Sequence, residues 1–179
     1  MQQSGAPVRV SGPRIKAMSA QGLTWLASLE GGCKLKTYRD SAGIPTIGVG
    51  CTWWPTTPTR KRVEMGDSLP SVAEGMLMFR RVLRDYEATV DACTHDAIKQ
   101  EMFDALTSLC YNIGQTAFAG STVVKRLNAG APLIVVAAEI RRWNRAAGAI
   151  SEGLVERREC EADLLLYGCY RTQGKERAA

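Results

Sequence analysis

The sequence predicts an α+β fold, in which a short antiparallel sheet precedes a series of helices. Two observations lead to this fold class. Residues 36–52 are rich in Thr, Tyr, Ile and Val around one turn sequence, which is typical of two short strands. Beyond residue 71, apolar residues recur every three or four positions, which is typical of amphipathic helices. A length of 179 residues with 45% hydrophobic residues fits one soluble domain with its own core.

The first element expected is a helix that begins near Ser19, because leucines recur at helical spacing up to residue 29. The Gly31-Gly32 pair should end this helix, since glycine readily adopts the backbone conformation that follows a helix. Glu30 then lies on the last turn. The first dozen residues of the chain are rich in turn formers, and we expect a loose arm over residues 1–18.

Two strands are expected over residues 36–40 and 44–52, joined by a turn at residues 40–43. Asp is favoured at the first position of a type I turn and Gly at the fourth, as they occur here. In the second strand, apolar residues alternate with Gly48 and Gly50. This alternation would leave one face of the strand bare enough for a ligand to approach closely.

A long helix is expected over residues 71–92, because its apolar residues form one stripe and Ser71 stands three residues before Glu74, the spacing of a capping box. Such a helix could connect two lobes. Further helical segments are predicted over residues 100–112, from about residue 121, around residues 133–145 and over residues 152–167.

The net charge of +5 comes from 23 basic and 18 acidic residues and favours a polyanionic partner, with nucleic acid, an anionic membrane and a bacterial wall as candidates. Pairs such as Arg80-Arg81 and Arg157-Arg158 are most simply solvated helix faces. A nucleic-acid-binding role rests on this charge alone, so we expect no nucleic-acid partner.

The six cysteines are scattered and only one histidine, His95, accompanies them, so we expect no zinc site, no other metal and no cofactor. We expect free thiols, although Cys33 and Cys51 flank the segment that carries the chemistry and could form a redox latch. No stretch is apolar enough to span a membrane, and residues 1–18 lack the apolar core of a secretory signal.

Three polar residues between positions 30 and 46 have the chemistry of a glycosidase. Glu30 is a carboxylic acid at a helix end, Asp40 is a second carboxylate ten residues on, and Thr46 is a hydroxyl six residues later. Two carboxylates with a water molecule between them can hydrolyse an acetal. Each residue also has a structural alternative: a solvated helix end for Glu30, a turn former for Asp40 and a strand residue for Thr46.

The chain resembles the phage-type lysozymes, the muramidase family that bacteriophages use as endolysins. The resemblance covers about residues 19–168 in the order of the family. Its motifs are Glu30-Gly31, Leu35, Tyr38, Asp40, Gly43, Thr46-Ile47-Gly48-Val49-Gly50 and Thr52, and then Tyr111-Asn112-Ile113-Gly114, Phe118, Ser121-Thr122, Asn128, Arg142-Trp143, Gly153-Leu154-Val155, Arg157-Arg158-Glu159, Glu161 and Leu166-Tyr167-Gly168.

This resemblance implies a lysozyme-like architecture for a catalytic domain over residues 19–170, followed by a tail at residues 171–179. A small antiparallel-sheet lobe at about residues 30–66 and a larger helical lobe at about residues 96–170 would be joined by the long helix at residues 71–92, with the substrate cleft between the lobes.

The activity implied is hydrolysis of the β-1,4 bond between N-acetylmuramic acid and N-acetylglucosamine in peptidoglycan. By resemblance, Glu30 matches the general acid, Asp40 the second carboxylate, and Thr46 the hydroxyl that holds the attacking water, which favours inversion. Arg157 matches an arginine that orients the acid. The matches to substrate-binding positions are Tyr111, Asn112 and Ser121, whose structural alternatives are a helix aromatic, a helix end and an N-cap.

As an endolysin, the protein would be a monomer that stays in the host cytoplasm before lysis, then reaches the peptidoglycan strands of the periplasmic wall through a partner such as a holin. Two other readings stay open. One is a non-catalytic wall-binding or phage structural module with the same fold. The other is a lytic transglycosylase, which needs an acid but no hydrolytic water, and which the presence of Asp40 and Thr46 disfavours.

The sequence departs from the family pattern at three places. The interval between Glu30 and Asp40 is one residue longer than usual, so the Gly31-Gly32 pair looks like an insertion beside the acid. Cys51 replaces a common histidine, and an unexpected Trp53-Trp54 pair follows. The insertion matters most, because a displaced acid would weaken catalysis steeply.

Overall fold

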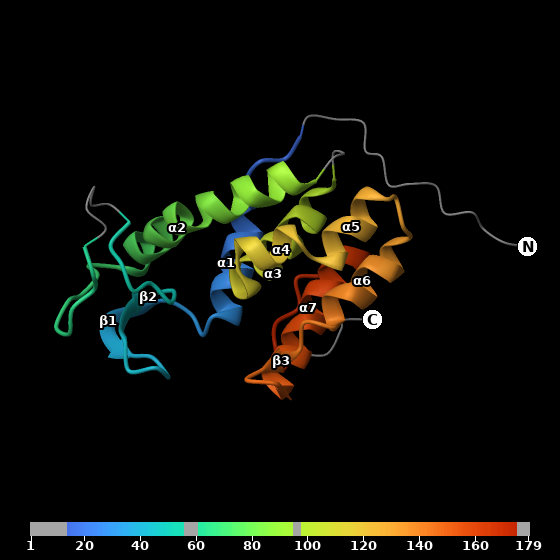
Figure 1. The fold of residues 1–179 in the computed structure, drawn as a ribbon. Coiled ribbons are helices and arrows are strands. Elements are labelled where there is room, and N and C mark those ends of the chain that lie inside the picture. Colours follow the sequence, from blue (N-terminus) through green and yellow to red (C-terminus); the bar gives the residue numbers. More distant parts are fainter. Residues whose placement is uncertain (1–13, 56–60, 95–97, 175–179) are drawn as a thin grey trace, which may run out of the picture. The chain divides into compact units, whose positions relative to one another are not determined.

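The structure is a computed structural model that describes residues 14–55, 61–94 and 98–174. It confirms the α+β fold, with helices and two small antiparallel sheets. The chain forms two compact units (Figure 1). The first, called here the sheet unit, is Leu26–Arg84, and the second, the helical unit, combines Met1–Trp25 with Asp85–Ala179. His95 and the ends of the chain, 1–13 and 175–179, lie outside the described residues.

The chain passes through its helices and strands in the following order: α1 (Ala20–Leu29), β1 (Lys34–Arg39), β2 (Pro45–Gly48), α2 (Val72–Cys93), α3 (Gln100–Ile113), α4 (Gln115–Ala119), α5 (Thr122–Asn128), α6 (Leu133–Arg141), β3 (Arg145–Ala146), β4 (Ala149–Ile150) and α7 (Glu152–Tyr167).

In the sheet unit, β1 and β2 pair in antiparallel register, with Tyr38 opposite Thr46. The second strand is shorter than the predicted 44–52. It ends at Gly48, and the chain reverses so that the backbones of Ile47 and Cys51 exchange two hydrogen bonds of 2.9 Å. Gly48 and Gly50 take positive φ angles of 62° and 70° in this reversal. The glycines therefore serve a tight turn, and the prediction that they leave a strand face bare was wrong.

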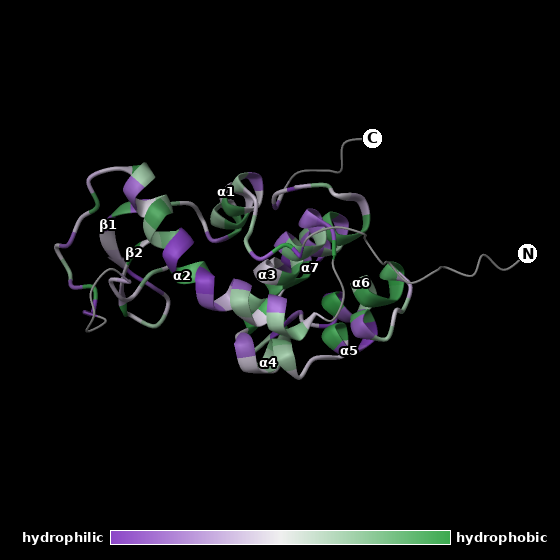
Figure 2. Cartoon of the chain, turned by 90° about the horizontal axis from the view of Figure 1, so that it is seen from above, coloured by the Kyte–Doolittle hydropathy of each residue, from purple (hydrophilic) through white to green (hydrophobic). Residues whose placement is uncertain are grey.

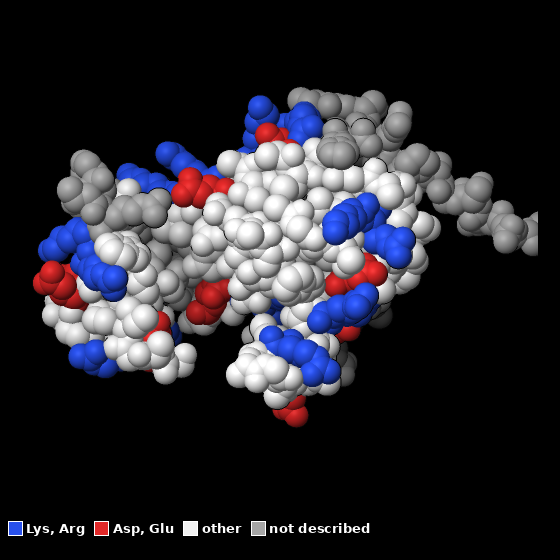
Figure 3. Space-filling view, in the orientation of Figure 1, with Lys and Arg blue, Asp and Glu red and all other residues white. Residues whose placement is uncertain are grey.

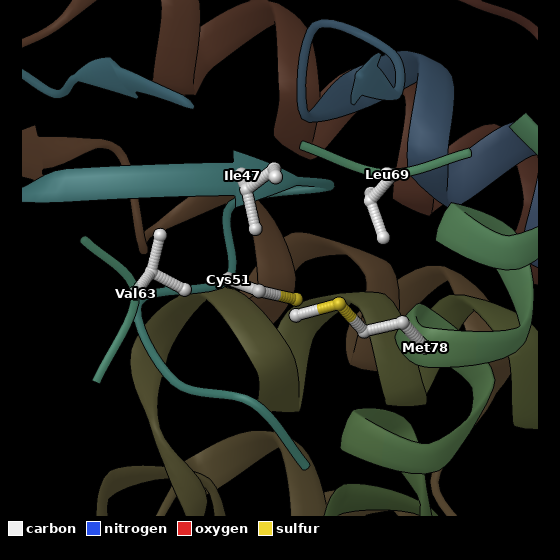
Figure 4. Close-up of a cluster of buried hydrophobic side chains, with 5 residues drawn as sticks. All are labelled: Ile47, Cys51, Val63, Leu69 and Met78. Carbon is white, nitrogen blue, oxygen red and sulfur yellow. The ribbon is translucent and has the colours of Figure 1, made fainter. Parts of the chain in front are cut away.

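The core of the sheet unit is a small apolar cluster that joins β2 to the loops after it and to α2. Its buried members are Ile47, Cys51, Val63, Leu69 and Met78 (Figure 4). The side chains of Cys51 and Met78 point toward each other, and the partly buried Cys33 packs against the cluster. Cys33 and Cys51 thus share one apolar environment as free thiols.

The long helix α2 begins where the sequence predicts, since the Ser71 hydroxyl oxygen accepts a 3.2 Å hydrogen bond from the Glu74 amide. Polar and apolar residues alternate along α2, as the purple and green patches of Figure 2 show. The apolar positions Phe79, Leu83 and Val90 are fully buried. The stripe predicted from the sequence therefore supplies core residues to both units.

The helical unit is organised around α7, against which α3 and α6 pack, while α5 packs against α6. All residues of α3 from Met102 to Cys110 are buried. The predicted helix around residues 133–145 was too long: α6 ends at Arg141, and β3 and β4 form a short hairpin instead. Ala147 and Gly148, with φ angles of 47° and 83°, make the turn of this hairpin.

The carboxylate of Asp104, which is fully buried on α3, holds together three segments that are distant in the sequence. It accepts hydrogen bonds from the Ser19 hydroxyl at 2.6 Å, the Gln100 amide at 2.8 Å and the Tyr170 hydroxyl at 2.7 Å. Met18 also donates its backbone N–H to Glu87 of α2 at 2.8 Å. These hydrogen bonds thus hold the described residues before α1 and after α7 against α2 and α3 within the helical unit.

The interpretation of Arg157-Arg158 as a solvated pair was wrong, since 5% and 0% of these residues are exposed. On the face of each unit that Figure 3 shows, basic side chains are spread out, with acidic side chains between them. Within the described part of the chain, no helix is both long enough and apolar enough to cross a membrane.

The burial of three cysteines leads to a prediction about thiol reactivity. Burial raises the pKa of Cys51 and Cys160 to about 11 and that of Cys110 to about 12. At pH 8, only about 0.1% of a thiol with a pKa three units higher is the reactive thiolate. We expect these three thiols to resist Ellman's reagent at pH 8 until urea unfolds the protein, as followed by mass spectrometry of the labelled peptides. Full labelling of any of the three in the folded protein would contradict this burial.

Candidate active site

Glu30 directly follows α1, whose last residue is Leu29. Its backbone N–H still donates to the carbonyl of Leu26 at 3.1 Å. The next two amides then close a Schellman motif, from Gly31 to the Ser28 carbonyl at 3.2 Å and from Gly32 to the Ala27 carbonyl at 2.8 Å. Both glycines have positive φ angles, 83° and 80°. The glycine pair therefore ends the helix as predicted, and Glu30 keeps its place on the helical backbone.

The positive φ angle of Gly31 makes a quantitative prediction possible. A Cβ atom at this position would meet no atom within 4 Å, so any cost of substitution comes from the backbone conformation alone. We expect Gly31→Ala to lower the free energy of unfolding by about 1–2 kcal/mol, as measured by urea titration. Gly31→Asn should cost less, since asparagine tolerates the left-handed region. Equal losses for Ala and Asn would show that backbone conformation is not the cause.

Asp40 is half-buried at the first position of the turn between β1 and β2. Its Oδ1 atom accepts hydrogen bonds of 2.9 Å from the backbone N–H groups of Ala42 and Ile44, and its carbonyl accepts one from Gly43. The second carboxylate oxygen, Oδ2, has no partner among the described residues. The turn thus fixes the carboxylate through one oxygen and leaves the other able to accept a hydrogen bond from water.

Thr46 lies on β2, with only 2% of the residue exposed. Its hydroxyl donates to the carbonyl of Ile44 at 3.0 Å, so its oxygen retains lone pairs that can accept a hydrogen bond. Since Tyr38 pairs with Thr46 and side chains alternate along a strand, Asp40 and Thr46 are diagonal neighbours on the same face of the hairpin. The register of the hairpin therefore places the positions of the predicted carboxylate and hydroxyl diagonally across the two strands.

The hydroxyl of Tyr38 lies in the electrostatic field of both predicted catalytic acids. Its pKa is raised first by burial and then by the negative charges of Asp40 and Glu30. A charge acts on a neighbour in this way only over short distances in solvent. The charges of Asp40 and Glu30 thus both act on the Tyr38 hydroxyl within the sheet unit. Tyr38 belongs to the motif that carries the resemblance, but nothing in its sequence context distinguishes it from an ordinary strand tyrosine.

The other predicted site residues belong to the helical unit. Tyr111, near the end of α3, packs edge-on against the ring of Tyr86 with ring centroids 5.0 Å apart. Ser121 is buried and is the N-cap of α5, where its hydroxyl oxygen accepts a 3.3 Å hydrogen bond from Val124. Ser121 therefore has the structural role that the sequence left open, and its contact with substrate stays a prediction.

Arg157, the residue expected to orient the acid, is part of a buried ionic cluster on α7. Its Nε lies 3.3 Å from Oε1 of Glu161, a fully buried carboxylate that also accepts a 2.7 Å hydrogen bond from Ser108. Arg158 is paired with the same carboxylate at 2.8 Å and donates to Oδ1 of Asn112 at 3.0 Å. The role of Arg157 at the acid stays a prediction.

Sequence reasoning did not identify Arg158 and Glu161 as parts of a site. The signal that could have found them is the spacing of Glu161 from the two arginines, four and three residues, which places all three on one face of a helix. Among the residues that the structure describes, no group of three or more His, Cys, Asp or Glu side chains could hold a metal ion.

Comparison with known proteins agrees with this arrangement. The family model described as phage lysozyme matches residues 28–161. The chain is 39% identical over 111 residues to the endolysin of Salmonella phage P22, covering 62% of this chain and 73% of that protein. It is 30% identical over 156 residues to the endolysin of Bacillus phage PZA, covering 84% of this chain but only 55% of that protein, so it spans about half the length of this relative.

A solved structure shares the fold over nearly the whole chain. The endolysin from Escherichia coli O157:H7 phage FAHEc1 superposes with a TM-score of 0.74 and 34% identity, over 92% of this chain and 99% of that one. The family model, the P22 relative and this structure agree with one another. The chain therefore belongs to the phage lysozyme family of peptidoglycan-lysing enzymes.

Proposed function

We propose that this protein is an endolysin that hydrolyses the β-1,4 bond between N-acetylmuramic acid and N-acetylglucosamine in bacterial peptidoglycan, with inversion at the anomeric carbon. The observation that carries the proposal is the Asp40 carboxylate, which the turn holds through Oδ1 while Oδ2 stays able to accept a hydrogen bond from water, on the same hairpin as the Thr46 hydroxyl. Glycoside hydrolysis requires such a carboxylate together with a second carboxyl group, here Glu30, on the other side of the scissile bond.

Glu30 is the general acid in this proposal. The oxygen of a glycosidic bond is a poor leaving group unless it is protonated as the bond breaks. Glu30 is half-buried, and the Schellman motif holds its backbone although the family interval to Asp40 is lengthened by one residue. The extra glycine is accommodated at the helix end, which supports a carboxyl group that keeps its working position.

Asp40 and Thr46 position the attacking water in this proposal. Oδ2 of Asp40 is available to accept a proton, and the Thr46 oxygen can accept a hydrogen bond from the same water molecule. A water molecule held by these groups would attack the face of the sugar opposite the leaving oxygen, so the product is the α-anomer. Inversion follows from using water as the nucleophile in a single displacement.

Two alternatives predict different products or none. A lytic transglycosylase would use Glu30 without a hydrolytic water and would release 1,6-anhydro sugars. A non-catalytic wall-binding or structural module would keep the fold without turnover, and the inserted glycine is the feature that favours it. Asp40 with one available oxygen beside Thr46 supports hydrolysis over both alternatives.

The test is digestion of purified bacterial sacculi, with the soluble products identified by mass spectrometry. We expect disaccharide muropeptides that end in reducing N-acetylmuramic acid, and proton NMR during the first turnovers should show its α-anomer. Products with 1,6-anhydro ends would establish the transglycosylase reaction, and an initial β-anomer would rule out inversion. No soluble product would favour the non-catalytic module.

We also propose which residues contact the glycan strand, where the protein acts and which partner it needs. Tyr111, Asn112 and Ser121 are the proposed contacts with the glycan strand, and Arg157 the proposed residue that orients the acid. The protein acts as a monomer on the periplasmic wall and depends on a membrane-permeabilising partner such as a holin. Expression in the cytoplasm of a Gram-negative host should lyse the cells only when such a partner is co-expressed, and lysis without it would contradict this dependence.

A further inference from the structure

Arg158 connects the buried ionic cluster to a side chain at the surface. The residue is fully buried, and its guanidinium is paired with Glu161 through Nε, 2.8 Å from Oε2, and through Nη2, 3.1 Å from Oε1. Nη2 also donates to Oδ1 of Asn112 at 3.0 Å. Because Arg158 is fixed by its ion pair, the atom that it offers to Asn112 has a fixed position.

The chemistry of the guanidinium determines which way the Asn112 amide faces. A guanidinium carries only hydrogen-bond donors, so the atom of Asn112 that faces it must be the carbonyl oxygen Oδ1. The amide nitrogen Nδ2 then points away from Arg158. Asn112 is exposed at the end of α3, and within the described residues Nδ2 makes no hydrogen bond. The structure therefore presents two N–H donors of Asn112 to solvent.

We propose that Arg158 is a positioning residue that fixes the Asn112 amide as a hydrogen-bond donor for an acetamido carbonyl oxygen of the glycan. This inference rests on the proposed function. An acetamido carbonyl is the strongest neutral acceptor on an N-acetylated sugar, and the cation behind Oδ1 polarises the amide so that its N–H groups donate more strongly. An amide free to rotate would present its oxygen half of the time and lose this selectivity.

The test compares variants of the full chain in the Glu30→Gln background, in which turnover is strongly slowed, by titrating soluble uncross-linked peptidoglycan strands in a calorimeter. Asn112→Asp keeps the oxygen that Arg158 holds and replaces the outward nitrogen with an acceptor. We expect an unchanged or higher melting temperature and an affinity about 3- to 10-fold weaker. Equal affinity of the Asp and Asn forms would overturn the donor role.

The acetamido assignment is tested with strands that have been enzymatically de-N-acetylated. Removing the acetyl groups should weaken binding by the Asn112 protein more than binding by the Asn112→Asp variant, since only the former has a donor whose acceptor on the sugar is removed. Equal weakening of both, including complete loss of binding by both, would overturn the acetamido assignment.

The positioning role is tested with Arg158→Lys, which retains the buried charge but loses the fork that reaches both Glu161 and Asn112. We expect Asn112→Ala to weaken binding by a smaller factor in the Lys background than beside Arg158. Equal factors would overturn the positioning role. Asn112→Asp leaves Arg158 untouched, so the donor role is tested even if the Lys variant is unstable.

Failure of the inference can be told from failure of the proposed function. If the wild-type protein releases reducing muropeptides and Asn112→Asp binds strands normally, only the inference fails. If neither muropeptide release nor strand binding by the Glu30→Gln protein is observed, the proposed function fails, and the inference with it.

Discussion

Glu30→Gln is expected to reduce the rate of peptidoglycan hydrolysis by a factor of about 10²–10⁴, the range that a positioned general acid contributes. The substitution keeps the shape of the side chain but removes the proton that the leaving oxygen needs. The backbone of residue 30 is held by its hydrogen bond to Leu26 and by the two glycine amides that follow it. The fold should therefore persist, with a melting temperature within about 4 °C of the wild type.

Two matched variants make this prediction specific. Glu64→Gln is the same chemical change at an exposed position of the sheet unit, and it should leave the rate unchanged. Asp40→Asn retains the Oδ1 atom that accepts from Ala42 and Ile44, so the turn should form while the negative charge is lost. We expect it to slow hydrolysis by a factor similar to that of Glu30→Gln.

The rates are measured as the loss of turbidity of sacculi suspensions, and binding as the fraction of protein that sediments with the sacculi. A Glu30→Gln protein that remains folded, binds sacculi and hydrolyses them at more than about one tenth of the wild-type rate would remove Glu30 from the mechanism. Loss of binding together with activity would instead indicate that the substitution disturbs the site.

Much of the backbone around the site could be predicted because local chemistry determines it. The Gly31-Gly32 pair marks the end of α1, and Ser71 marks the start of α2 through its cap to Glu74. Asp40 stands at the start of a turn that its own carboxylate stabilises. Each of these signals lies within a few residues of the feature that it predicts, so no knowledge of the folded chain is needed.

The predictions from sequence failed where contacts between distant segments, or residues with strained backbone angles, determine the structure. Arg158 looks like a surface residue because its neighbours are charged, and only the packing of α3 and α6 on α7 makes it buried. The helix predicted around residues 133–145 runs past the end of α6 at Arg141, and the hairpin that follows was not predicted. Its turn places Ala147 at a positive φ, which sequence preferences disfavour, and Gly148 was the one local sign of it.

Glu161→Gln is expected to lower the free energy of unfolding by about 3–5 kcal/mol, because it leaves two buried guanidinium groups without a counter-charge. Arg157 and Arg158 both lie against Glu161, which is itself fully buried. Replacing its carboxylate with an amide keeps the shape and a carbonyl oxygen for Ser108 but removes the negative charge. The melting temperature should fall by about 6–20 °C.

Glu159→Gln is the matched control on the same helix. Glu159 pairs with Arg141 at 2.8 Å, but 40% of its side chain is exposed, so its ion pair should contribute less than about 1 kcal/mol. Urea unfolding of both variants compares the same substitution in a buried and an exposed ion pair. If Glu161→Gln lowers the free energy of unfolding no more than Glu159→Gln does, the proposed contribution of the buried ionic cluster to stability is wrong.

A double variant, Glu161→Gln with Arg158→Gln, shows whether the loss of stability comes from uncompensated charge or from a simple packing defect. If an uncompensated charge is responsible, the double variant should lose less stability than the sum of the two single variants, because neutralising Arg158 removes one of the stranded cations. A packing defect would instead give losses that add. The ionic cluster also holds Asn112 through Arg158 at 3.0 Å, so a destabilised cluster should release the amide that faces the solvent. The stability of the helical unit and the orientation of a proposed substrate contact would then depend on the same buried carboxylate.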